Sequence, residues 1–126
     1  MRSEDVILHI CPQGAWQAAQ AGGEYRADSL DTEGFIHCSQ PEQVLAVANR
    51  YYRGVPDLVV VWIDPTQVIA EIRWEPALGE VYPHIYGALN TDAVAAISDF
   101  ASGEGGIFYR FPEPLSMLWQ IEDGDE

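Results

Sequence analysis

The sequence predicts one α+β domain with six short strands and three helices. Three observations lead to this fold class. The chain has 126 residues, a length typical of one domain. Hydrophobic residues make up 48% of it, enough for a buried core. Strand and helix signals follow one another in mixed order, without an internal repeat. We expect a single domain over 1–126, with its core over about 5–115 and an acidic tail over about 120–126.

The first half of the chain is expected to contain two strands, two helices and a loop. Short apolar runs predict the strands, whereas Pro or a capping residue opens each helix and glycine ends it. The strongest local signal is a capping box, Ser39-x-x-Glu42, with Pro41 in the first turn. The expected elements are a strand over 5–11, a helix over about 13–21, an irregular loop over 24–34, a strand over 35–39 and a helix over about 40–52.

The second half is expected to contain four extended segments and one helix. Residues 57–64 are apolar on both strand faces, which is typical of a central strand. Residues 68–75 alternate, with Glu71, Arg73 and Glu75 pointing outward. The remaining expected elements are an extended segment over 82–87, a helix that Thr91 caps and that reaches Phe100, and a strand near 107–111.

The charge balance excludes several classes of function. Twenty acidic residues face six basic ones, all arginines, and the net charge is −14. Such a charge repels nucleic acid and anionic lipid, so we expect neither as a partner. Without lysine the chain cannot form a lysine Schiff base or a lysine-bearing phosphate loop. The acidic N-terminus and short apolar runs predict a soluble, cytoplasmic protein with no membrane partner. The sequence leaves the oligomeric state open.

Three histidines are the main candidates for chemistry. His9, His37 and His84 each fall in a predicted strand or extended segment. If these strands are neighbours, the imidazoles converge on one site, and imidazole suits proton transfer near neutral pH. We therefore expect all three as catalytic candidates, with Tyr86 on the same strand face as His84. The alternative is that each is a hydrogen-bonded histidine of the core or of a turn.

A small anionic or polar ligand is the expected partner of such a site. Arg50 and Arg53 lie three residues apart on one helix and suit a phosphate or carboxylate. The alternative is that they pair with surface carboxylates. Ser39 and His37 would lie beside the positive end of the same helix.

Metal and thiol chemistry are weaker alternatives. The histidines with Cys11 and Cys38 contain zinc-ligand types, but no C-x-x-C or H-x-x-x-H spacing occurs, so we expect no metal. Either cysteine beside a histidine could be a nucleophile. A small buried hydrophobic residue is the preferred interpretation of each.

Four ordered blocks resemble a bacterial family catalogued as domain of unknown function nine-five-two. They are GFIHCS at 34–39, VANRYYRG at 47–54, DLVVVWID at 57–64 and YPHIYG at 82–87. The similarity runs from about Ile7 to about Pro112. Ala88 departs from the proline that is usual there in the family.

The resemblance implies a fold like that of ADP-ribosyltransferases, with small split sheets around an NAD site. Within that superfamily, the chain resembles the two-histidine branch, which includes the RNA 2′-phosphotransferases. The implied function is binding of NAD or an ADP-ribose-type ligand and its transfer to an unknown acceptor. The family supplies no catalytic glutamate for this chain, so a non-catalytic ligand- or protein-binding module on the same fold is the alternative.

Residue roles follow from the same resemblance. His9 would bind a ribose hydroxyl, His37 and Ser39 the nicotinamide-side ribose, and Arg50 or Arg53 the diphosphate. His84 and Tyr86 would close the site or orient the acceptor.

Overall fold

The central sheet is built around the most apolar segment of the chain. The computed structural model describes residues 6–113, so the acidic tail lies outside the described residues. Strand β4 (Leu58–Ile63) lies between β1 (Ile7–Pro12) and β8 (Val94–Phe100), and both neighbours are antiparallel to it. All residues of β4 are buried, which confirms that this segment is a central strand.

Apolar side chains on both faces of this sheet form two core clusters. Alternation along β1 sends Leu8 to one cluster with Val60 and Trp62, and Ile7 to the other with Val61 and its neighbours. Burial on both faces explains why β4 reads as a continuous apolar run.

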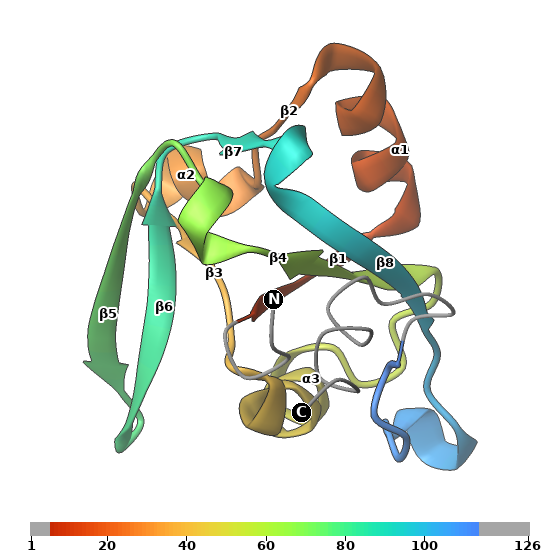
Figure 1. The fold of residues 1–126 in the computed structure, drawn as a ribbon. Coiled ribbons are helices and arrows are strands. Elements are labelled where there is room, and N and C mark those ends of the chain that lie inside the picture. Colours follow the sequence, from red (N-terminus) through yellow and green to blue (C-terminus); the bar gives the residue numbers. More distant parts are fainter. Residues whose placement is uncertain (1–5, 114–126) are drawn as a thin grey trace, which may run out of the picture.

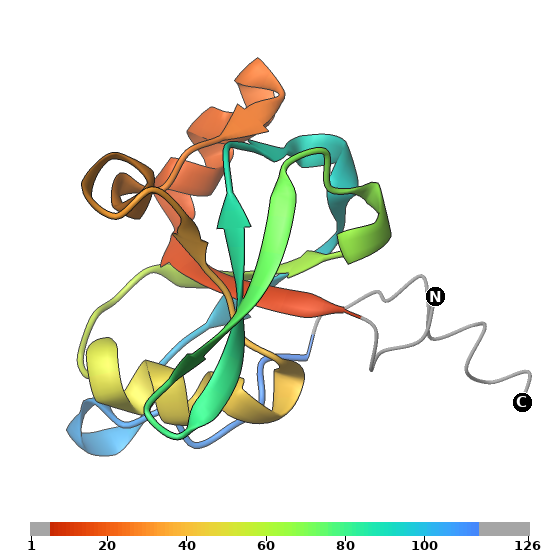
Figure 2. The ribbon, with the colours of Figure 1, turned by 90° about the vertical axis from the view of Figure 1, so that its left-hand side faces the viewer.

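A second antiparallel sheet carries two of the histidines. Its strands are β3 (Ile36–His37), β6 (Glu80–Tyr86) and β5 (Glu71–Ala77), in the order β3-β6-β5. Leu78 and Gly79 join β5 to β6, and both have positive φ, as a type I′ hairpin turn requires. The β5–β6 hairpin stands at one side of the molecule in Figure 1 and faces the viewer in Figure 2.

The remaining elements connect and cover these sheets. Strands β2 (Glu24–Tyr25) and β7 (Leu89–Asn90) form a small antiparallel pair. The helices are α1 (Gln13–Gly22), α2 (Asp28–Thr32) and α3 (Val44–Tyr51). Short 3₁₀ turns are η2 (Pro41–Gln43), η3 (Pro65–Gln67), η4 (Thr91–Ala93) and η5 (Glu104–Gly106). Among the described residues, no helix has the length and apolarity that crossing a membrane demands.

The helix expected after Thr91 is wrong. Thr91 opens only the turn η4, and the chain continues as strand β8. Ala93, Val94, Ile97 and Phe100 have helical spacing, but β4 is buried and its second edge needs a hydrogen-bonding neighbour. The need to pair β4 therefore outweighs the local helical pattern.

Three further expectations are corrected. The segment 24–34 is not an irregular loop throughout, because it contains β2 and α2. Residues 107–111 form no strand; instead Phe108 is held by two hydrogen bonds to the Asn49 amide. The capping box belongs to Gln40 and Gln43 rather than to Ser39 and Glu42.

Candidate functional site

One face of the β3-β6-β5 sheet gathers titratable and aromatic side chains. His37 lies opposite His84 on β6, and His84 lies opposite Arg73 on β5, so these side chains point to the same side. The other side carries Ile36 and Ile85, both fully buried. We call the first side the histidine face, and it consists of Phe35, His37, Arg73, Glu75, His84 and Tyr86.

Glu75 joins two residues of the neighbouring strand. His84 Nδ1 donates to Glu75 Oε1 at 2.7 Å, and the Tyr86 hydroxyl donates to the same oxygen at 2.6 Å. The bond from Tyr86, followed by that from His84, lowers the pKa of Glu75, so the carboxylate stays ionised at neutral pH. With Nδ1 used in this way, His84 keeps Nε2 for a ligand or a proton.

A second carboxylate orients the other imidazole. Glu33, which caps the C-terminal end of α2, accepts a hydrogen bond from His37 Nε2 at 3.0 Å. The His37 side chain is 54% exposed, whereas that of His84 is only 10% exposed. The histidine face therefore has one accessible imidazole and one largely covered imidazole, each held by its own glutamate.

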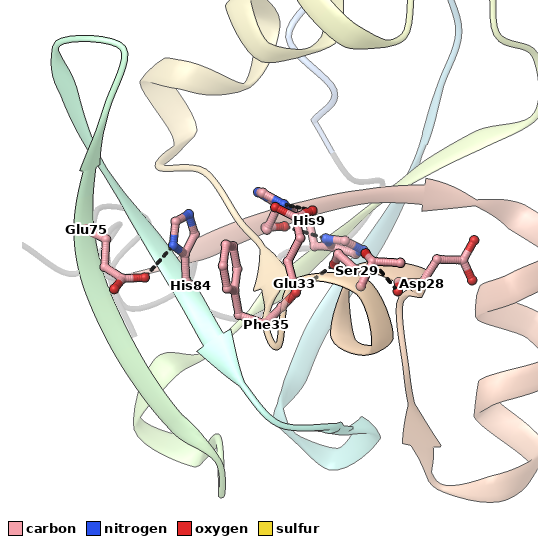
Figure 3. A network of polar contacts seen from close by, with 9 residues as sticks. His9, Asp28, Ser29, Glu33, Phe35, Glu75 and His84 are labelled. Carbon is pink, nitrogen blue, oxygen red and sulfur yellow. Dashed lines mark hydrogen bonds and ion pairs between the residues drawn. The ribbon is translucent and has the colours of Figure 1, made fainter.

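Phe35 lies against both imidazoles. Its ring stacks on His84 with centroids 4.1 Å apart and meets His37 edge-on at 4.8 Å. The centroids of His37 and His84 are 5.4 Å apart. Figure 3 shows Phe35 beside the His84 ring, with Glu75 reaching the same ring from β5. The imidazoles of His37 and His84 therefore lie together on this face, two of the three that the sequence predicts to converge.

The cation of this face is Arg73. Its guanidinium lies 4.2 Å from the centre of the Tyr86 ring and 3.1 Å from a Glu71 carboxylate oxygen. The alternating sequence pattern places Glu71, Arg73 and Glu75 outward on one strand, but it gives no reason to prefer them over other surface charges.

Arg50 and Arg53 lie elsewhere. Both are exposed, at the C-terminal end of α3, where Asn49 and Gly54 hydrogen-bond to the segment 106–108. No described contact joins either arginine to the histidine face.

His9 lies behind this face rather than on it. Its Nδ1 donates to the His37 carbonyl oxygen at 2.6 Å, and its Nε2 accepts from the Tyr25 hydroxyl at 2.9 Å. Burial lowers the pKa of His9 to about 4, so the ring is neutral at pH 7. Both ring nitrogens are occupied, and His9 positions the backbone of β3 instead of contacting a ligand.

Ser39 and the two cysteines are also internal. Ser39 is buried, and its backbone exchanges two hydrogen bonds with Leu8, which fixes the end of β3 to β1. Burial raises the pKa of Cys11 to about 11 and that of Cys38 further, so both remain thiols. Within residues 6–113, no three His, Cys, Asp or Glu side chains are grouped as a metal site requires.

Solved structures with a similar fold come from Caulobacter crescentus. The crystal structure of protein CC0527 has a TM-score of 0.77 and 27% identity, covering 82% of this chain and 93% of that chain. The solution NMR structure of CC0527 has a TM-score of 0.71 and 28% identity, covering 82% and 90% respectively.

Sequence comparison places the chain in a family without an assigned activity. None of the curated proteins matches it. The model of a family described as protein of unknown function (DUF952) matches residues 10–97, well over half of the chain. This match agrees with the resemblance of the four sequence blocks. The chain therefore belongs to the DUF952 family of proteins of unknown function.

Proposed function

We propose that the histidine face binds an ADP-ribose-type ligand, with NAD as the first candidate, and transfers the ADP-ribosyl group to an acceptor. The observation that carries the proposal is the pair of glutamate-held imidazoles, His37 and His84, side by side on one sheet face. The resemblance of the sequence to the ADP-ribosyltransferase superfamily supplies the ligand class, and the two small antiparallel sheets are compatible with it.

The chemistry of the face suits such a ligand. Imidazoles exchange hydrogen bonds with ribose hydroxyls, and the accessible His37 is the first to meet them. Arg73 is a cation for the diphosphate, because guanidinium binds phosphate oxygens with two parallel hydrogen bonds. Phe35 and Tyr86 offer ring surfaces for the nicotinamide or the adenine.

Transfer would proceed by cleavage of the nicotinamide–ribose bond. Nicotinamide leaves with the bonding electron pair, and an oxocarbenium-like ribosyl cation remains. The ionised Glu75 carboxylate stabilises this positive charge. The acceptor oxygen or nitrogen then bonds to ribose C1′, and its proton passes to Nε2 of His84.

Thermal unfolding with NAD, ADP-ribose and nicotinamide tests ligand binding. A ligand at a hundred times its dissociation constant adds about 2.7 kcal/mol to the free energy of unfolding, a shift of several degrees in Tm. We expect that shift with NAD or ADP-ribose for the wild type, and its loss in His37→Gln and Arg73→Ser. Arg53→Ser is the matched control, because it also removes an exposed arginine but lies away from the face.

Turnover separates the two functional candidates. Nicotinamide release from NAD, followed by chromatography, is expected for the wild type and is expected to fall at least about a hundredfold in Glu75→Gln. Ligand binding without nicotinamide release would favour the non-catalytic module. The absence of any thermal shift with all three compounds, or an equal loss in Arg53→Ser, would refute the assignment of this face.

A further inference from the structure

Strand β5 has a free edge whose backbone groups point outward. The sheet order β3-β6-β5 leaves β5 at the margin, and within residues 6–113 no strand pairs with its outer side. The Pro83 carbonyl accepts from Cys38 N–H, so the backbone of Pro83 faces β3. Trp74 lies opposite Pro83, and its own N–H and C=O must therefore face away from β6.

The same alternation explains the place of Pro76. Ile72, Trp74 and Pro76 share the outward orientation, and Pro76 has no N–H to leave unpaired at the edge. Two outward N–H groups, those of Ile72 and Trp74, therefore remain as donors along β5.

Exposed apolar side chains accompany this edge. Trp74 is 52% exposed, and Val81, which lies on the same side of the hairpin, is 44% exposed. Leu78 at the hairpin tip is 59% exposed and has a φ of 53°, a conformation that costs a leucine energy and that glycine or asparagine adopts readily. The exposure of Trp74 at a free strand edge does not favour the isolated monomer.

We propose that β5 pairs antiparallel with β5 of a second copy, with the two-fold axis at Trp74. Trp74 then faces Trp74 of the second copy, and the two residues exchange two hydrogen bonds. Ile72 donates to the Pro76 carbonyl of the second copy, and the symmetry repeats this bond. Two three-stranded sheets thereby become one continuous sheet.

Charge complementarity selects this register. With Trp74 at the axis, Arg73 lies opposite Glu75 of the second copy, and Glu75 lies opposite its Arg73. Sliding one copy by two residues in either direction sets Arg73 against Arg73 or Glu75 against Glu75, which repel. The pairing also brings the two histidine faces side by side, because Arg73 and Glu75 belong both to the histidine face and to the paired strand β5.

Charge-reversal variants test the pairing without a ligand. Arg73→Glu copies carry two glutamates at the paired positions, and Glu75→Arg copies carry two arginines. Each variant alone should be monomeric, whereas an equimolar mixture should form heterodimers, because opposite charges then face each other at both positions. Sedimentation equilibrium at about 0.15 M salt measures this, since ionic strength at that level screens the long-range repulsion between two acidic chains.

Two further variants complete the test. Trp74→Pro removes the central outward N–H and the indole. We expect it to raise the dissociation constant of the dimer at least about tenfold above that of the wild type. Tyr109→Ser is the matched control, because Tyr109 is an exposed aromatic residue of similar exposure, 62%, on another segment. Circular dichroism confirms that each variant is folded. A wild type that stays monomeric up to about millimolar concentration, the range of nonspecific contact, would overturn the proposal. So would dimers that are indifferent to Trp74→Pro, or a folded mixture without heterodimers.

Discussion

At the residue scale, hydrogen-bond partners separate the three histidines into different roles. His9 is enclosed between β1 and β3, and its two ring nitrogens are used by the His37 carbonyl and the Tyr25 hydroxyl. His37 and His84 lie on the histidine face, His37 exposed and His84 largely covered, and each donates to a glutamate. Sequence periodicity identifies strand faces, but it does not reveal which groups the imidazole nitrogens bind. His9 therefore supports the backbone of the site, and the other two carry its chemistry.

The buried imidazole of His9 makes stability depend on pH. The unfolded chain binds the His9 proton near pH 6.5, but the folded protein binds it only near pH 4, because burial disfavours the charged ring. The unfolded state therefore holds more protons between these values, and stability falls as the pH falls through this window. We expect the free energy of unfolding to drop by about 2 kcal/mol between pH 7 and pH 5.

Urea unfolding at several pH values checks this loss. In His9→Gln the side chain does not titrate, so its free energy of unfolding should vary much less between pH 7 and pH 5 than that of the wild type. Carboxylates titrate in both proteins and cancel in the comparison. Equal pH dependence of the wild type and the variant would show that His9 does not control this loss.

At the element scale, close contacts between backbone segments determine packing that local sequence patterns do not specify. The chain between α3 and β4 is fastened to the segment around η5 by a hydrogen bond from Gly54 N–H to the Gly106 carbonyl. A Cβ at Gly106 would lie 2.8 Å from Gly54 N and 2.9 Å from its Cα. The backbones therefore meet at this point only because residue 106 is glycine, whereas a Cβ at Gly54 would have no atom within 4 Å.

Gly105 and Gly106 form a matched pair for testing this contact. Both have positive φ, 72° and 75°, so alanine at either position pays a conformational cost of about 1 kcal/mol. Only Gly106→Ala also collides with backbone, which we expect to add about 1–3 kcal/mol of destabilisation. Urea unfolding of both variants measures the difference. Equal destabilisation of the two would contradict the close packing of Gly54 and Gly106.

At the scale of the whole molecule, net charge is the dominant feature. A charge of −14 on 126 residues opposes compaction, and few of the carboxylates have a cationic partner available among six arginines. The histidine face uses one of these arginines, Arg73, on its own surface. The ligand proposed for this face would therefore meet a local cation within an acidic molecule.

Salt should stabilise the protein as a whole. Raising the ionic strength from about 0.01 M to about 0.15 M shortens the Debye length from about 30 Å to about 8 Å and screens the repulsion among carboxylates. We expect Tm to rise by several degrees, as measured by differential scanning calorimetry. Sodium chloride and choline chloride should act equally, because ionic strength rather than a specific ion is responsible. A fall in Tm with salt would mean that attractive pairs dominate instead.

The sequence by itself determined the strand faces and the central strand. Side-chain alternation assigned β1 to two core clusters, and the apolar run at 58–63 could be buried only between two neighbours. It also determined the approximate boundaries of α1 and the end of α3, where proline or glycine limits the backbone. The histidines were recognisable because imidazole is rare in this chain and suits chemistry.

Only the tertiary structure decided which of these residues meet. The segment 94–100 became a strand because β4 needed a second partner, and hydrogen bonding across 36 or so residues is not visible in a local pattern. Arg73 and Glu75, rather than Arg50 or Arg53, reached the histidines because strand register set β5 beside β6. His9 lies behind the face because its ring hydrogen-bonds to the backbone of β3. Pairing and burial are properties of distant segments in contact, and the order of residues along the chain does not specify them locally.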